Sequence, residues 1–187
     1  KDNGKEYYKR IFKLCSELMI NINNCSKPII AVVDGIATAA GCQLISSCDL
    51  AYSSNRSQYA TPGVNIGLFC STPMVPLSRN VAKKHAMEML LTGDLINAEK
   101  AKSIGLINDI FEPEKLNNKV IEIASKIASK SKTTIKIGKK AFYEQKEMSL
   151  EDAYNYTSKI MAENMLHQDS EEGISAFLEK RIPNWKE

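Results

Sequence analysis

The stretch KPIIAVVDGIATAAGCQLISSCDLAYSS, residues 27–54, decides the fold. Its first part, residues 28–35, is a continuous apolar run rich in β-branched side chains and closed by Asp-Gly, which predicts a strand buried on both faces. Residues 38–49 are crowded with small side chains and predict a helix that packs very close to its neighbours. Two further short strands are expected over residues 50–53 and 57–60.

Helical patterns flank this stretch on both sides and dominate toward the C-terminus. Pro113 opens one helix, and two or three more are expected to carry the chain to Arg181. The predicted organisation is an α/β region, residues 1–112, followed by a nearly all-helical region, residues 113–187. The other expected elements are helices over residues 6–22, 73–80, 83–91 and 97–103, a loop over residues 62–73 and a strand over residues 106–111.

The composition excludes several classes of protein. Of the 187 residues, 43% are hydrophobic and 25% are charged, which is typical of a folded globular chain. The net charge of +3 has both signs interspersed, so it suits a small anionic ligand but gives no support for nucleic-acid binding. No apolar run is long enough for a membrane span.

The cysteine and histidine counts bear on metal binding and on the compartment. Five cysteines without a CxxC pair lie in apolar segments, which predicts buried thiols in a reducing compartment, and two histidines make a zinc site improbable. We expect no metal. The first residue is lysine rather than methionine, so a processed or truncated chain is expected.

Common catalytic and phosphate-binding motifs are absent. The sequence contains no GxGxxG, GxxxxGK[ST] or GxSxG pattern. What remains is the strand-to-helix junction of the opening stretch, where a helix N-terminus offers free backbone N–H groups that can stabilise a developing oxyanion. On spacing alone, tight packing of a helix on a sheet explains the same small residues, and more simply.

The pattern KPxIAxVxGxAxxxGCxL…CDxAxxS, residues 27–53, resembles the core signature of the enoyl-CoA hydratase/isomerase (crotonase) superfamily. The resemblance covers essentially the whole chain, with its motifs in the right order. The combination AAGCQL with ATPGVNIGLFCSTP is similar to one mitochondrial group within the superfamily, which implies a mitochondrial location. The further motifs are YATPGVNIGL (59–68), AMEMLLTGDLINAEKAKSIGLIND (86–109) and EEGISAFLEKRIPNW (171–185).

The resemblance implies a crotonase-like ββα spiral core, truncated at its N-terminus, with a C-terminal helical region that builds homotrimers or hexamers. The implied ligand and partner is an acyl-CoA, a coenzyme A thioester, with no covalently bound cofactor. Members of the superfamily hold the thioester oxygen with two backbone N–H groups. The second of them matches Ala40, beside Gly41, whereas the first lies upstream of this sequence.

The resemblance also exposes a departure in the groups that transfer protons. Hydratases of the superfamily use two glutamates, and the matching positions here are Gln43 and Gly63. An amide can orient a water but cannot exchange a proton at neutral pH, and glycine can do neither, so efficient hydration is not expected. If the pocket is otherwise that of a hydratase, glutamates at both positions should create measurable hydration.

Three interpretations of the function follow from this departure. The leading one is an acyl-CoA-binding protein of the family that acts in fatty-acyl-CoA metabolism. The alternatives are a non-catalytic acyl-CoA-binding or regulatory protein, and an acyl-CoA decarboxylase or isomerase that relies on the oxyanion hole alone. The further candidate substrate-binding residues are Asn65, Ser71 and Thr72, which more commonly form turns, and Phe177 and Lys180 near the C-terminus.

Overall fold

The computed structural model describes the backbone of residues 2–186 and the side chains of residues 4–186. Its contacts divide the chain into two compact units. The first unit contains the N-terminal residues up to Asn23 and Ile29–Glu122, and the second contains Asn24–Pro28 and the residues from Ile123 on. This division falls inside a helix that begins at Pro113. The predicted domain boundary at residue 112 stays a prediction for the whole protein.

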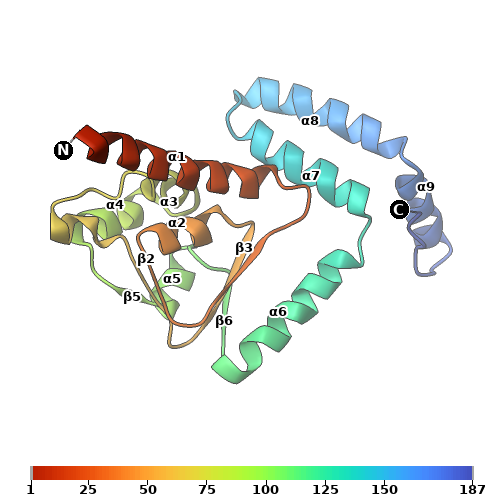
Figure 1. The fold of residues 1–187 in the computed structure, drawn as a ribbon. Coiled ribbons are helices and arrows are strands. Elements are labelled where there is room, and N and C mark those ends of the chain that lie inside the picture. Colours follow the sequence, from red (N-terminus) through yellow and green to blue (C-terminus); the bar gives the residue numbers. More distant parts are fainter. Residues whose placement is uncertain (1, 187) are drawn as a thin grey trace. The chain divides into compact units, whose positions relative to one another are not determined.

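The described elements alternate strands with helices and then become helical (Figure 1). In chain order they are α1 (Asp2–Asn24), β1 (Ile30–Val33), β2 (Ile36–Thr38), α2 (Ala40–Ser47), β3 (Leu50–Ser54), β4 (Gln58–Ala60), the 3-10 helix η1 (Pro62–Ile66), α3 (Met74–Asn80), α4 (Lys83–Thr92), β5 (Ile96–Asn97), α5 (Ala98–Ser103), β6 (Asp109–Phe111), α6 (Pro113–Ala128), α7 (Lys132–Gln145), α8 (Leu150–Met165) and α9 (Gln168–Leu178).

Two three-stranded sheets organise the first unit, in the orders β1-β3-β6 and β2-β4-β5. β3 pairs in parallel with both β1 and β6, and β2 pairs in parallel with β4. The chain therefore passes from one sheet to the other twice, β1 to β2 and β3 to β4, before each helical segment. This is the ββα order that the resemblance implies.

A sharp turn between β1 and β2 moves the chain from the first sheet to the second. Gly35 has a φ of 137°, a conformation open to glycine but to few other residues. Its N–H donates to Ser57 Oγ at 3.1 Å, and Ser57 Oγ donates to the carbonyl of Val33 at 3.0 Å. The Arg56 guanidinium binds Asp34 through two contacts of 2.7 and 2.6 Å, which lowers the pKa of that carboxyl. These contacts tie the turn after β1 to the turn after β3.

A buried polar cluster fixes the second of these turns. Tyr59 Oη donates to Ser53 Oγ at 2.6 Å, and Ser53 Oγ donates to the carbonyl of Ser54 at 2.8 Å. The hydroxyls of Ser54 and Ser57 lie 2.9 Å apart. All four side chains are fully buried, and burial raises the pKa of Tyr59, so its phenol stays protonated as a donor. Because each of these hydroxyls has a partner, the cluster avoids the cost of an unpaired buried polar group.

The hydrophobic core of the first unit lies between the sheets and the surrounding helices. α2 contacts β2 and α3, and α5 contacts β5 and β6, so short helices close around the strands (Figure 1). Small side chains on α2 and α5 allow this close approach, as expected for residues 38–49. Buried members of the core include Val33, Cys42, Ile45, Tyr59, Leu77, Met89, Leu90 and Ala101.

The predicted elements agree with the structure except in the strands and in the loop expected over residues 62–73, where Pro62–Ile66 form the 3-10 helix η1. The helices expected over residues 73–80, 83–91 and 97–103 are confirmed by α3, α4 and α5, and α1, α6 and the three helices α7–α9 are also confirmed. β2 and β5 were not predicted, because runs of two or three residues carry almost no periodicity. The prediction that the strand over residues 28–35 is buried on both faces is wrong, since β1 is shorter, lies at a sheet edge and leaves Val32 46% exposed.

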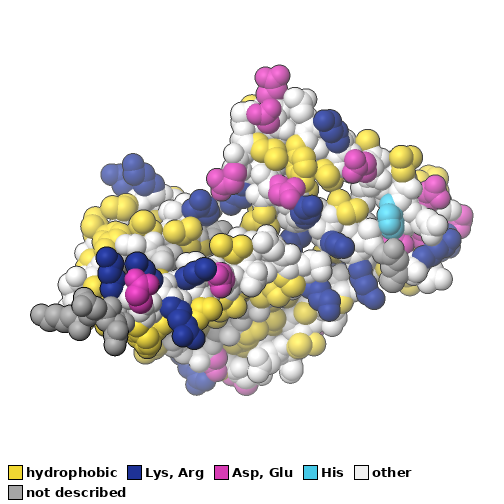
Figure 2. Space-filling model, turned by 45° about the horizontal axis from the view of Figure 1, so that its top comes forward, with side chains coloured by type: hydrophobic (Ala, Val, Ile, Leu, Met, Phe, Trp, Pro, Cys, Tyr) yellow, Lys and Arg dark blue, Asp and Glu magenta, His cyan; other side chains and the backbone are white. Residues whose placement is uncertain are grey.

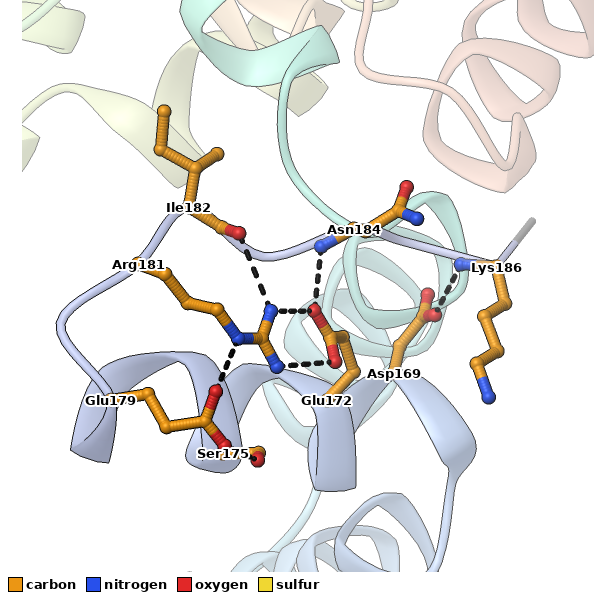
Figure 3. A network of polar contacts seen from close by, with 8 residues as sticks. All are labelled: Asp169, Glu172, Ser175, Glu179, Arg181, Ile182, Asn184 and Lys186. Carbon is orange, nitrogen blue, oxygen red and sulfur yellow. Dashed lines mark hydrogen bonds and ion pairs between the residues drawn. The ribbon is translucent and has the colours of Figure 1, made fainter.

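The second unit ends in a network that holds the C-terminal residues against α9 (Figure 3). Arg181 binds both carboxylate oxygens of Glu172, at 2.6 and 3.0 Å, and Glu179 at 2.6 Å. The N–H of Asn184 also donates to Glu172, at 2.7 Å. The Arg181 guanidinium and this N–H hold the pKa of Glu172 at about 2, so the carboxylate stays charged at neutral pH. The residues after α9 are thereby tied back to it.

Candidate functional site

The start of α2 has an unusual backbone geometry. Ala39, which precedes the helix, has φ 48° and ψ −113°, a region that residues with a Cβ seldom adopt. Two hydrogen bonds hold it there: its N–H donates to Ala60 O at 3.0 Å, and its carbonyl accepts from Gln43 N at 3.0 Å. No side chain of Ala39 caps the helix, so the first-turn amides of Ala40 and Gly41 have no partner from that cap. These N–H groups can donate to an anionic or carbonyl oxygen.

The strain at Ala39 leads to a prediction. Ala39→Gly should raise the free energy of unfolding by about 1 kcal/mol, because glycine adopts positive φ without the Cβ clash. Urea denaturation followed by circular dichroism measures this difference. Gly41→Ala is the matched control, since its added Cβ would make only an ordinary contact of 3.8 Å with Ala37 Cβ. A destabilised Ala39→Gly variant would contradict the strain at this residue.

Gln43 lies one turn further along α2 and is 3% exposed. Its Oε1 accepts a weak hydrogen bond from Cys15 Sγ on α1, at 3.6 Å. The Nε2 group makes no hydrogen bond within the described chain. It keeps some contact with solvent, since it is not among the fully buried side-chain atoms that lack a partner. The side chain therefore offers one free N–H donor beside the helix N-terminus, and it carries no carboxylate.

Gly63 occupies a position with no room for a side chain. A Cβ at this residue would lie 2.7 Å from the carbonyl oxygen of Leu68 and 2.9 Å from Cys70 Sγ. The Gly63 N–H donates to Cys70 Sγ at 3.3 Å, and the Gly63 carbonyl accepts from Leu68 N at 2.9 Å. The backbone thus closes on itself around Gly63. A glutamate introduced here meets a steric obstacle that the sequence alone does not show.

The buried thiol of Cys42, near these positions, is unsuited to proton transfer at neutral pH. Burial raises the pKa of Cys42 to about 11, so it stays a neutral thiol. Cys70 is also buried and serves as the acceptor for Gly63 N–H. Sequence reasoning missed Cys15 and Cys70 as neighbours of Gln43 and Gly63. The position of Cys15 on the apolar face of the helix expected over residues 6–22 indicated that the side chain packs against another element, but not which one.

The loop candidates Asn65, Ser71 and Thr72 make local contacts. The Asn65 side chain lies against Gly93, where an added Cβ would approach the Asn65 amide to 3.1 Å. Ser71 Oγ donates to Phe69 O at 3.4 Å, and the carbonyl of Thr72 accepts from Val75 N at 3.2 Å at the start of α3. In the described chain, no hydrogen bond joins any of the three to Gln43. Their roles toward a ligand stay predictions.

Phe177 and Lys180 belong to the second unit, at the end of α9. Phe177 is 81% exposed, and Lys180 is exposed with a φ of 56°. Both lie beside the network around Arg181. Their predicted contact with the ligand stays a prediction.

An open groove of about 580 Å³ runs along β1 and β2 to the first turn of α2. Its lining is mostly apolar and includes Val32, Ile36 and Leu44, with Thr38 and Gly41 at the end next to α2. β1 and β2 each stand at the edge of their sheet. Within residues 2–186, the groove therefore exposes two strand edges that no other strand covers. Among the described residues, no group of three or more His, Cys, Asp or Glu side chains is placed to hold a metal ion, and no helix is long and apolar enough to cross a membrane.

Comparison with known proteins places this geometry in a family. The sequence pattern of the family described as enoyl-CoA hydratase/isomerase matches residues 2–187. The mitochondrial enoyl-CoA hydratase domain-containing protein 3 of Rattus norvegicus is 48% identical over 182 residues, which cover 97% of this chain and 61% of that protein. The Homo sapiens protein of the same name is 47% identical over 184 residues, which cover 98% of this chain and 61% of that protein. The chain thus spans about 61% of the length of these relatives.

Solved structures agree with the sequence match. The crystal structure of human enoyl-CoA hydratase domain-containing protein 3 has a TM-score of 0.96 and 47% identity, covering 99% of this chain and 73% of that one. An enoyl-CoA hydratase of Mycobacterium smegmatis has a TM-score of 0.95 and 46% identity, covering 97% and 71%. These scores confirm the crotonase-like α/β fold with its C-terminal helical region. The chain belongs to the enoyl-CoA hydratase/isomerase family.

Proposed function

We propose that the protein binds acyl-CoA thioesters and holds the thioester oxygen with the Ala40 N–H at the start of α2. The uncapped first turn supplies the donor, and the small side chains of Ala39, Ala40 and Gly41 let a ligand approach the backbone. The first oxyanion donor of the family lies upstream of the residues described. The exposed edges of β1 and β2 are where strands that carry that donor would pair in the whole protein.

We further propose that this site does not hydrate enoyl-CoA efficiently. The observation that carries this is the closed loop around Gly63, where the carbonyl of Leu68 occupies the space of a Cβ. Gln43 carries an amide and Gly63 has no side chain, so neither of the family's glutamate positions carries a carboxylate here. This favours an acyl-CoA-binding protein, including its non-catalytic or regulatory form. Enolate chemistry on the oxyanion hole alone, as in a decarboxylase or isomerase, is tested by mass spectrometry of the products from a panel of acyl-CoA thioesters.

Titration calorimetry on the protein expressed from its complete coding sequence tests the binding proposal. An acyl-CoA is expected to release heat of binding, and Ala40→Val should weaken its affinity about tenfold because the branched side chain hinders approach to the amide. Ala40→Gly is the matched control and should retain the affinity. A folded protein that gives no heat with any acyl-CoA would sink the proposal.

We also propose that the second unit supports a homotrimer or hexamer. Among its apolar side chains, Phe142, Tyr154 and Met161 are exposed, whereas Ile135, Tyr143 and Ile160 are half-buried. On the face shown in Figure 2, hydrophobic side chains are exposed among basic and acidic ones. Association of the subunits would bury these exposed apolar side chains. Multi-angle light scattering should report a trimer or hexamer at micromolar concentration, and a clean monomer would contradict the assignment.

The relatives named as mitochondrial support a mitochondrial location, and the implied ligand supports a role in fatty-acyl-CoA metabolism. We propose both this location and this role. Imaging of the complete protein with a C-terminal fluorescent tag tests the location.

A further inference from the structure

We infer that Gln43 selects acyl-CoA ligands that carry a hydrogen-bond acceptor at C3 of the acyl chain, such as a 3-oxo group. This inference deepens the proposed function and rests on it. The first observation is that Gln43 is only 3% exposed, while its Nε2 donates to nothing in the described chain. Nε2 is not itself among the fully buried atoms, but a ligand that excluded water from it would leave a donor without a protein partner, which is costly. The group is therefore suited to receive an acceptor from the ligand.

The oxygen end of this amide is held from α1. Cys15 Sγ lies 3.6 Å from Oε1 and acts there as a donor, because the amide oxygen is an acceptor. In this arrangement the amide oxygen faces α1 and the Nε2 group is directed elsewhere. Cys15 is a positioning residue.

The place of Gln43 on α2 relates it to the carbonyl-binding amide. Residues three apart on a helix are neighbours, with about 5–6 Å between their Cβ atoms. Helical side chains lean toward the N-terminus, so Gln43 leans toward the turn that begins with Ala40. With the thioester oxygen on the Ala40 N–H, C3, which is two bonds from the thioester carbonyl carbon, lies within the range of the Gln43 amide.

The chemistry then distinguishes ligands by their C3 substituent. A saturated chain presents only hydrogens at C3 and leaves Nε2 unsatisfied once water is excluded. A 3-oxo group accepts from Nε2, and a 3-hydroxyl can also accept. A site built around a buried polar group discriminates strongly against an analogue that lacks the partner. No carboxylate at residue 43 or 63 is present to repel the acceptor.

Calorimetry with three ligands of equal chain length tests the inference on the protein expressed from its complete coding sequence. Acetoacetyl-CoA should bind about tenfold more tightly than butyryl-CoA, with 3-hydroxybutyryl-CoA between them or equal to acetoacetyl-CoA. Gln43→Met replaces the amide with an apolar group of similar shape, and the affinity ratio of acetoacetyl-CoA to butyryl-CoA should fall to about one. At a pH where the introduced carboxyl is ionised, Gln43→Glu supplies only acceptors, so it should then prefer 3-hydroxybutyryl-CoA over acetoacetyl-CoA.

Two Cys15 variants test the positioning role. Cys15→Ala removes the thiol donor and should reduce the ratio, whereas Cys15→Ser retains a donor and should restore it. Equal affinity of the unaltered protein for all three ligands overturns the inference and leaves acyl-CoA binding intact. Absence of binding to any of the three overturns both. The comparison within the unaltered protein needs no variant, so a Gln43 variant that fails to fold does not remove the test.

Discussion

Hydration of a short enoyl-CoA by the full protein is expected to be about 10²- to 10⁴-fold slower than by a hydratase that carries both carboxylates. Hydration adds hydroxide to C3 and a proton to C2, so a nearby group must take a proton from water and another must deliver one. The Gln43 amide does neither at neutral pH, and Gly63 has no side chain. Burial raises the pKa of Cys42 to about 11, so this thiol also holds its proton.

A spectrophotometric assay of the enoyl double bond, run beside a two-glutamate hydratase at equal subunit concentration, measures this deficit. The control is acyl-CoA binding by the same preparation, which shows that the site is assembled. Turnover close to that of the comparison enzyme would mean that a group other than residues 43 and 63 transfers the proton.

Gln43→Glu alone should recover only part of the hydration activity. The new carboxyl would be buried beside Cys15, and burial raises the pKa of a carboxyl group. Its activity as a base should therefore rise with pH as the group ionises. Since one carboxylate would have to serve both the water and the α-carbon, the gain stays below that of a two-carboxylate site.

The fold was predictable from the sequence wherever a segment is long or strongly biased. The helix at residues 83–91 and the small-residue helix after the opening strand carry clear periodic or compositional signals, and both are confirmed. β2 and β5 are two or three residues long, so their existence depends on pairing with β4 rather than on their own pattern. The exposure of Val32 was unpredictable because an apolar β-branched run looks the same in a central strand and at a sheet edge.

For the candidate site, the sequence located the residues but not the contacts around them. Residues 40, 43 and 63 were singled out through the resemblance, which fixes positions along the chain but not the space around them. The contact of Cys15 with Gln43 joins residues 28 positions apart and depends on how α1 crosses α2. The enclosure of Gly63 comes from Leu68 and Cys70, whose sequence neighbours suggest only a loop. Contacts of this kind arise from tertiary packing, and local sequence carries no signal for them.

The enclosure at Gly63 gives the last prediction. Gly63→Ala should lower the free energy of unfolding by about 1–3 kcal/mol, because its Cβ would lie 2.7 Å from a backbone oxygen that cannot rotate away. Urea denaturation measures the change. Gly138→Ala on α7 is the matched control: its Cβ meets nothing within 4 Å, so it should stabilise the helix by up to about 1 kcal/mol.

Cys70→Ala separates the two obstacles at Gly63. It removes Sγ, 2.9 Å from the added Cβ, but leaves the Leu68 carbonyl in place, so it should restore only part of the stability that Gly63→Ala loses.

The same geometry bears on the double variant Gln43→Glu with Gly63→Glu. It should lose stability and gain little hydration activity beyond Gln43→Glu alone, whereas the sequence led us to expect measurable hydration from the two glutamates. A folded double variant with the activity of a two-glutamate hydratase would show that residues 63–70 rearrange to admit a side chain. Hydration in this family would then depend on the two carboxylates alone, and the closed loop would be a consequence of their loss rather than a barrier to their return.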